Sequence, residues 1–363
     1  MRLTHFENIR PICPRCRGNS NIIAPLELQQ ITSEKGDVVF EGILKCSNEE
    51  CQMHYPIIDG IPIILPNLQQ YLKDNFLFIT ARNDFSPVIT SLLGDALGPG
   101  SRFNNTRHHV SSYGWDHYGD KITMPDVTTA AGTDMPGNAL RCLEAGLDLL
   151  PGEPVSPALD IGCALGRTTF ELAEQHNSLA LGCDISFWTL RIAQEILHQG
   201  KIRFPLKHLG LVYHQTEHEV VFDNRDKVDF WICNALSMPF RQETFAFVAA
   251  LNVFDVSAMP RDLLLSIRNV LQTSGRAIIT TPYDWTTGVP TEKWLGGHAQ
   301  HLTHGGNSEQ MMRDLLTPGM KGKIPNLQLV GEITHHPWHV RVHSRRTAVY
   351  DTHILACEKT LHR

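Results

Sequence analysis

The sequence predicts an α/β protein: a doubly wound, mostly parallel sheet of seven strands with a small cysteine-rich module at its N-terminus. Between residues 156 and 285, apolar runs of strand length alternate with stretches of helical periodicity. This alternation is typical of parallel sheets built from right-handed crossovers. After residue 326, two long strand-like segments follow each other without a crossover between them, which predicts an antiparallel hairpin. Residues 1–66 contain two pairs of closely spaced cysteines.

Apolar periodicity and its breaks predict the individual elements. Strands are expected at 157–161, 179–183, 228–233, 245–251, 275–281, 327–342 and 348–357. Helices are expected at 68–79, 138–150, 165–176, 187–199 and 258–271. Residues 94–106 are rich in Gly, Pro and Asn, which predicts a loop. The chain should therefore divide into a cysteine module at 1–66, a helical and loop linker with a lid at 67–155, and an α/β domain at 156–363.

Composition narrows the range of functions. The chain has 363 residues, 42% of them hydrophobic, and a net charge of −6. This acidic balance makes nucleic acid an unlikely obligatory partner and favours a small-molecule substrate. No apolar run reaches the roughly 18 residues of a membrane helix, and no signal-peptide core stands at the N-terminus, so we expect a cytoplasmic protein with reduced thiols. The oligomeric state is left open, with a homo-oligomer among the alternatives.

The first cysteine pair is Cys13-Pro-Arg-Cys16, and the second is Cys46 with Cys51. Four thiolates in two pairs suit tetrahedral structural zinc. Four sulfur ligands would leave no open position for a water molecule, which argues against a catalytic zinc site. In a module this small, metal binding would supply much of the folding free energy.

A glycine-containing loop follows the first predicted strand of the α/β domain. The strand ends in Asp160, the loop is Gly162-Cys163-Ala164-Leu165-Gly166, and the next strand ends in Asp184. A close backbone approach followed by an acid at the next strand end is typical of nucleotide-type cofactors. Dinucleotide dehydrogenases share this pattern, but Asp160 would repel a pyrophosphate and can instead bind an ammonium group. Ala164 replaces a middle glycine, which is tolerable if this position does not need a positive φ.

With the terminal hairpin, this core resembles the class I methyltransferases, which use S-adenosylmethionine. The resemblance implies that Asp160 helps hold the methionine end of the cofactor, that Asp184 binds the ribose hydroxyls, and that Asn234 lies near adenine. The cofactor-binding residues predicted in this way are Asp160, Gly162, Cys163, Ala164, Gly166, Arg167, Asp184, Ile185, Asn234, Ala235, Leu236 and Asn252.

The N-terminal module resembles the small zinc-ribbon proteins that bind and activate tRNA, rRNA and release-factor methyltransferases. The resemblance rests on Cys13-Pro-Arg-Cys16, on Leu44-Lys-Cys46 and on the stretch Tyr55-Pro-Ile-Ile-Asp-Gly-Ile-Pro-Ile63. It covers about the first 66 residues and implies a scaffold or partner role.

A narrower resemblance is to the C-terminal methyltransferase domain of ovothiol synthases, and it covers about residues 113–360. It rests on the stretch from Asp160 to Ala173, on Leu251-Asn-Val-Phe-Asp255, and on Pro282-Tyr-Asp-Trp285 followed by Trp294-Leu-Gly-Gly297. It implies methylation of an imidazole ring nitrogen of 5-thiohistidine. The iron-binding sulfoxide-synthase domain of such synthases is absent from this sequence, so the thiohistidine would be made elsewhere.

An imidazole acceptor suggests roles for the remaining residues. Aromatic faces could sandwich a flat ring, Asp255 could fix its tautomer, and Arg341 or Arg345 could pair with an amino-acid carboxylate. We predict Asp255 and Tyr283 as catalytic. The predicted substrate-binding residues are Trp115, His117, Tyr118, Asp255, Tyr283, Trp285, Trp294, Arg341 and Arg345.

Each of these residues also has a plain structural alternative. Trp285 and Trp294 could pack a lid, Asp255 could cap a helix that begins near Met259, and the two arginines could be solvated. His298, His301 and His304 have a spacing that would place them on one helix face for a metal, but the neighbouring glycines favour a loop.

Two other functions stay open. Methylation of tRNA, rRNA or a translation factor would use the zinc ribbon as a recognition or activator module. A non-enzymatic scaffold is opposed by the intact Asp160, Gly162, Gly166 and Asp184.

Overall fold

A computed structural model describes residues 1–82, 84–122, 135–150, 152, 156–286, 290, 293–296, 300–301 and 305–361. Its strands are β1 (Leu26–Lys35), β2 (Val38–Cys46), β3 (His54–Ile58), β4 (Ile61–Ile64), β5 (Ala158–Ile161), β6 (Ala180–Asp184), β7 (Lys201–Lys207), β8 (Tyr213–Glu219), β9 (Val228–Cys233), β10 (Phe245–Leu251), β11 (Leu271–Thr281), β12 (Leu327–His343) and β13 (Arg346–Lys359). Eleven of them form one sheet in the order β1-β2-β3-β4-β9-β6-β5-β10-β11-β13-β12, and β7 and β8 form a separate ribbon.

All seven strands expected for the α/β domain are present and adjacent, from β9 to β12 in the sheet. Strands β4, β9, β6, β5, β10 and β11 run parallel, while β13 and β12 are antiparallel to their neighbours. Every residue of β5 and β9 is buried. Burial on both faces explains why these strands are apolar except for one aspartate each, Asp160 and Asp229, rather than alternating. The predicted α/β class with a mostly parallel central sheet is therefore confirmed.

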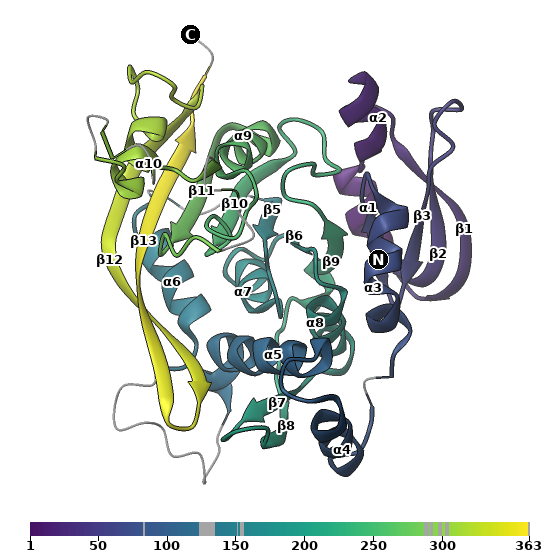
Figure 1. Cartoon of the computed structure of the whole chain (residues 1–363). Coiled ribbons are helices and arrows are strands. Elements are labelled where there is room, and N and C mark those ends of the chain that lie inside the picture. The colour runs from purple at the N-terminus through teal and green to yellow at the C-terminus, as the bar shows by residue number, and fades with distance from the viewer. Residues whose placement is uncertain are drawn as a thin grey trace.

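The helices are α1 (Leu3–Ile9), α2 (Pro14–Ser20), α3 (Leu68–Thr80), α4 (Pro87–Leu97), α5 (Arg102–Tyr118), α6 (Asn138–Leu147), α7 (Arg167–His176), α8 (Phe187–Gln199), α9 (Pro260–Val270) and α10 (Ser308–Leu316), with short 3₁₀ turns η1 (Gly119–Lys121) and η2 (Arg225–Lys227). Helix α8 contacts β4, β6 and β9, whereas α6 contacts β10 to β13. Helix α5 runs across the lower end of the sheet and contacts both β7 and β12 (Figure 1). No helix in the described parts of the chain is long and apolar enough to cross a membrane.

The N-terminal module extends the sheet of the α/β domain. Strands β3 and β4 are joined by Asp59 and Gly60, both at positive φ, as a two-residue hairpin turn requires. Strand β4 then pairs in parallel with β9, with Ile63 opposite Ile232. In Figure 1 the module lies beyond β9, opposite the long β12–β13 hairpin. A sheet of seven strands thus becomes one of eleven, because the module covers the edge that β9 would otherwise expose.

The loop predicted at 94–106 is wrong, since α4 continues to Leu97 and α5 begins at Arg102. Its asparagines and glycines serve a helix junction instead. The buried Asn104 donates from Nδ2 to the carbonyl oxygens of Gly94 and Gly98, at 2.7 Å each. The ribbon of β7 and β8 was not expected at all. Strand β7 alternates polar and apolar residues over only seven positions, and β8 is polar almost throughout, so neither gives a strong strand pattern.

Candidate active site and metal centre

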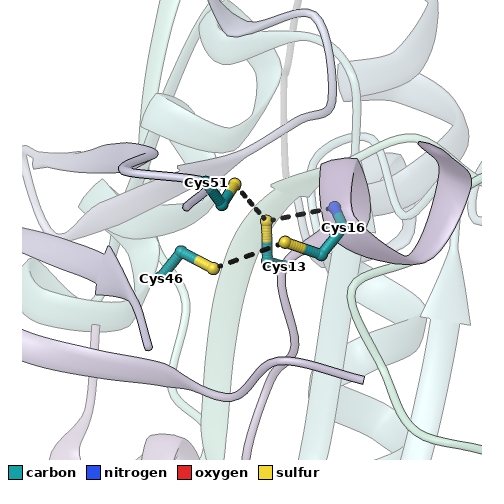
Figure 2. Close-up of side chains that lie close together, drawn as sticks. All are labelled: Cys13, Cys16, Cys46 and Cys51. Carbon is teal, nitrogen blue, oxygen red and sulfur yellow. Dashed lines mark hydrogen bonds between the residues drawn. The ribbon is translucent and has the colours of Figure 1, made fainter. Parts of the chain in front are cut away.

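The four cysteines of the N-terminal module converge on one point (Figure 2). Their sulfur atoms all lie within 4.8 Å of one another. The sulfur–sulfur distances are 3.7 Å for Cys13 and Cys51 and 3.7 Å for Cys16 and Cys46. Zinc–sulfur bonds of about 2.3 Å in a tetrahedron place the sulfurs about 3.8 Å apart, so this arrangement fits structural zinc.

Local structure positions these ligands. Cys13 is the residue before α2, and its sulfur accepts from the backbone N–H of Cys16. Cys46 ends β2, and Cys51 follows in the turn before β3. The hydroxyl of Tyr55 lies 3.1 Å from the Cys13 sulfur and can donate to a thiolate, as outer-shell partners of metal ligands do.

The glycine loop between β5 and α7 has a strained geometry. Gly162, Ala164 and Gly166 have φ values of +72°, +46° and +79°. A Cβ on Gly162 would meet Val253 at 2.5 Å, and one on Gly166 would meet Phe230 at 2.5 Å. Alanine would be tolerable at position 164 if its φ were negative. Its φ is instead in the left-handed region that favours glycine, so Ala164 is strained.

Asp160 lies next to the loop and is buried. Thr168 and Thr169, in the first turn of α7, both donate to its Oδ2, at 2.5 and 2.7 Å. Burial nevertheless raises the pKa of Asp160 to about 6. A carboxylate with a pKa this high is held in a site that a cationic ligand would stabilise.

Asp184 binds the loop from the next strand. Its Oδ2 accepts from the backbone N–H of Ala164 at 2.9 Å, and its Oδ1 from that of Ser186 at 2.8 Å. Burial raises its pKa as well. At the following strand end, the Oδ1 of Asn234 accepts from the backbone N–H of Leu236 at 2.9 Å. That bond engages the amide oxygen and orients the side chain in the turn.

A cavity of about 580 Å³ lies at the carboxyl ends of these strands. Ten of the predicted site residues line it: His117, Asp160, Gly162, Ala164, Asp184, Ile185, Asn234, Ala235, Leu236 and Asn252. Its charged lining groups are the carboxylates of Asp160 and Asp184, and no lysine or arginine lines it among the described residues. This donor set fits the sulfonium and ammonium charges of S-adenosylmethionine and opposes a pyrophosphate.

Three loop residues predicted to bind cofactor, Cys163, Gly166 and Arg167, are buried outside the cavity lining. Arg167 is 1% exposed and donates to both carboxylate oxygens of Asp120, to Glu171 and to the backbone oxygen of His117. It joins α7 to the end of α5. Cys163 is buried, and a Cβ at Gly182 would meet its sulfur at 2.8 Å.

Asp255 and Tyr283, predicted as catalytic, do not line this cavity. Asp255 is 5% exposed, its Oδ1 has no hydrogen-bond partner among the described residues, and burial raises its pKa to about 6. It does not cap α9, which begins without a side-chain cap. The neighbours Val253 and Val256 do line the cavity, so Asp255 stands directly behind its wall.

Tyr283 instead begins a chain of hydrogen bonds. Its hydroxyl lies 2.7 Å from Nδ1 of His353, whose Nε2 lies 2.9 Å from Oε2 of Glu332, which in turn pairs with Arg313 at 2.9 Å. These residues come from the end of β11 and from β13, β12 and α10. This series of hydrogen bonds connects the β12–β13 hairpin to the segment after β11. Burial raises the pKa of Tyr283.

The other predicted substrate residues lie in structural contacts outside the cavity lining. Trp285 stacks on Trp294 with ring centroids 5.9 Å apart. Tyr118 donates to the carbonyl of Leu165. Arg341 donates to the carbonyl of Lys207 and covers the ring of Trp115 at 5.3 Å.

Arg345 is exposed in the two-residue turn between β12 and β13. Of the three spaced histidines, only His301 belongs to the described residues. His298 and His304, like Gly297, lie outside them.

Several cavity residues were missed by sequence reasoning. They are Thr106, His109, Val110, Thr168, Trp188, Thr189, Val256, Ser257 and Trp338, among others. Thr168 and Trp188 stand only one and three residues beyond the predicted Arg167 and Ile185, so inspection of the helix starts could have found them. Trp338 lies in the long strand β12, and no local pattern distinguishes it.

A paired substitution in the loop tests its geometry. We expect Ala164→Gly to raise the free energy of unfolding by about 0.5–1 kcal/mol, because it relieves a left-handed alanine. Gly166→Ala should lower it by about 2–4 kcal/mol, because it adds both that strain and a clash with Phe230. Chemical denaturation measures both. Equal effects of the two substitutions would contradict the loop conformation.

Comparison with known proteins agrees with this geometry. Residues 159–279 match the family model described as a methyltransferase domain. No curated protein sequence matches the chain significantly.

Among solved structures, MccD protein is 13% identical, with 62% of this chain and 99% of that one covered and a TM-score of 0.39. Phosphoethanolamine N-methyltransferase 2 of Haemonchus contortus with S-adenosyl-L-methionine is 18% identical, with 50% and 34% covered and a TM-score of 0.34. The Haloferax volcanii Trm112 methyltransferase activator in complex with a methyltransferase is 14% identical, with 61% and 90% covered and a TM-score of 0.38. Sequence identities and TM-scores this low do not indicate a substrate or a partner for this protein.

The family match contains both acids, the glycine loop and the parallel strands whose ends form the cavity. The chain therefore contains an S-adenosylmethionine-dependent methyltransferase domain over residues 159–279.

Proposed function

We propose that this protein methylates a ring nitrogen of a small imidazole-containing molecule, with 5-thiohistidine as the first acceptor to test. S-adenosylmethionine would supply the electrophilic methyl group. Asp160 would hold its ammonium end, Asp184 its ribose hydroxyls, and the amide nitrogen of Asn234 would face adenine. The observation that carries the proposal is the acidic and aromatic cavity beneath α5.

The shape of the site favours a small acceptor. Helix α5 contributes Thr106, His109, Val110, Tyr113 and His117 to the lining, so it covers the ends of the strands. The volume lies within the roughly 300–1,000 Å³ typical of small-molecule pockets. A helix across the site leaves little access for a folded RNA or protein surface.

The lining also favours a flat acceptor. Aromatic faces come from Tyr113, Trp188 and Trp338. Burial, and then the charge of Arg167, lower the pKa of His117 to about 3, so this imidazole is neutral at ordinary pH. A neutral imidazole can accept a hydrogen bond from an acceptor N–H and so select its tautomer. The roles of Asp255 and Tyr283 as catalytic groups stay predictions.

Among the described residues, no lysine or arginine lines this cavity to pair with the carboxylate of a thiohistidine, since Arg341 and Arg345 lie outside the lining. We therefore propose that the ring, rather than the carboxylate, is what the site recognises. Turnover of labelled S-adenosylmethionine should be measured with 5-thiohistidine, histidine, histamine and bulk tRNA. We expect the imidazole compounds to be methylated, and we expect histamine to be methylated at a rate similar to that of histidine, because the site does not recognise the carboxylate. Methylation of tRNA alone would overturn the proposal in favour of the translation-related alternative.

Cofactor affinity should depend on the ionisation of Asp160. Because the pKa of this carboxyl is about 6, we expect S-adenosylmethionine to bind up to tenfold more weakly for each pH unit below 6. The stability of the cofactor-free protein should change in the opposite direction. The folded state holds this proton at pH values where the unfolded carboxyl, with a pKa of about 3.9, has lost it, so stability from this group falls as pH rises from about 4 to 6.

Calorimetric titrations and denaturation curves between about pH 4 and 8 measure the two effects. Asp160→Asn is the control, because it cannot ionise and should remove the pH dependence of both. A variant with the same pH profile as the original protein would show that another group is responsible.

A further inference from the structure

A second cavity, of about 430 Å³, lies between α4, α5, α8 and the ribbon of β7 and β8. It shares Val110 and Trp188 with the cofactor cavity, so the two are separated by these side chains. Aromatic rings reach it from Phe85, Phe103 and Trp188. The methyl-transfer site described above does not use this space.

Five cationic and three acidic side chains line the second cavity. Four of the five cations have a carboxylate nearby, in the pairs Arg82–Asp84 at 2.8 Å, Arg191–Asp59 at 3.2 Å, Lys201–Glu217 at 3.8 Å and Arg203–Glu217 at 2.5 Å. The fifth, Arg107, has no carboxylate within salt-bridge distance in the part of the chain that the structure describes, and Asp95 of α4 attracts it only from farther away.

Arg107 is also deeply placed. It is 7% exposed, its Nε has no hydrogen-bond partner among the described residues, and its Nη1 reaches only the Oδ1 of Asn104, at 3.4 Å. Its guanidinium covers the ring of Tyr213 at 4.1 Å. Helix α4 accommodates it with a glycine, since a Cβ on Gly94 would meet Nη1 at 2.5 Å.

These contacts compensate the charge only in part. Burying a charge without a counter-ion is costly, and a cation–π contact offsets that cost only in part. Burial accordingly lowers the pKa of Arg107, although an arginine remains charged in proteins. An anion in the cavity would supply the missing counter-charge. A guanidinium binds carboxylate and phosphate groups well, because its planar fork matches their oxygens.

We propose that the second cavity binds a small aromatic anion, with its carboxylate or phosphate against Arg107 and its ring against Phe103 and Trp188. The site is distinct from the cofactor cavity and does not depend on which acceptor is methylated. Its occupant would contact the cofactor cavity through Val110 and Trp188.

Calorimetric titration of the full chain tests this site without any activity readout. The probes are phenyl phosphate, benzoate and, as a cation of the same shape, benzamidine. We expect at least one of the two anions to bind and benzamidine to bind at least tenfold more weakly. Arg107→Met should weaken anion binding at least tenfold, and Arg107→Lys should restore part of it.

A matched control is Arg203→Met at the rim, whose side chain is 47% exposed and already paired with Glu217. It should change anion affinity less than twofold. A second variant, Thr90→Trp, fills the cavity from α4 while leaving Arg107 in place, and it should abolish anion binding. The proposal is overturned if neither anion binds, if benzamidine binds equally well, or if a folded Arg107→Met or Thr90→Trp protein binds the anion unchanged.

Discussion

Replacing Asp184 with alanine should weaken the binding of S-adenosylmethionine about 100-fold or more while the protein still folds. The carboxylate lines the cavity and accepts from the backbone N–H groups of Ala164 and Ser186. Hydrogen bonds to a charged group contribute about 1.5–3 kcal/mol each, and the loss of these two bonds would release the loop that shapes the site. Calorimetric titration measures the affinity.

The matched variants are Asp184→Asn, which keeps the shape and one acceptor oxygen, and Asp148→Ala, which removes an exposed acid outside the cavity lining. We expect Asp184→Asn to lie between the alanine variant and the original protein, and Asp148→Ala to bind normally. Unchanged affinity in the Asp184→Ala protein would refute the cofactor assignment.

Loss of the metal should destabilise the entire α/β sheet as well as the N-terminal module. Cys46 ends β2, and the module's last strand, β4, pairs with β9, whose end reaches the cofactor cavity at Cys233. Structural zinc contributes on the order of 10 kcal/mol to small metal-dependent folds. We therefore expect Cys46→Ala to lose bound zinc and to lower the free energy of unfolding by about 5 kcal/mol or more. Metal analysis and chemical denaturation measure the two effects.

The control for this variant is Cys357→Ala, which removes an equally buried thiol from β13, outside the cysteine cluster. It should keep its zinc and lose only about 1–2 kcal/mol through the small cavity it creates. If Cys46→Ala and Cys357→Ala behave alike, the four cysteines are a packed core rather than a metal centre.

The meeting of Asp160 and Asp184 at one cavity could be predicted because both residues stand at strand ends. Asp160 and Asp184 follow apolar runs, and the carboxyl ends of parallel strands meet at one edge of the sheet. Local sequence pattern is therefore enough to bring both acids to the same cavity. The four cysteines were grouped for a similar reason, since a short spacing within each pair restricts where the sulfurs can point.

The acceptor half could not be predicted in the same way. Trp338 meets the cavity because β12 pairs with β13 and α5 packs on β12, so its position depends on contacts between distant segments. Arg167 and Trp115 have the residue types of a binding site, yet a bidentate pair with Asp120 and a stacked Arg341 bury them in the scaffold. Residue type alone does not distinguish a ligand contact from an internal one.

By itself, the sequence determined the α/β class, the positions of the cofactor acids and the cysteine cluster, because each depends on short-range periodicity or spacing. Only the tertiary structure decided that the module extends the sheet through β4, that α5 covers the site, and that Arg107 lies at a second cavity without a carboxylate within salt-bridge distance among the described residues. These features arise from pairing and packing between residues far apart in the chain, which local patterns do not encode.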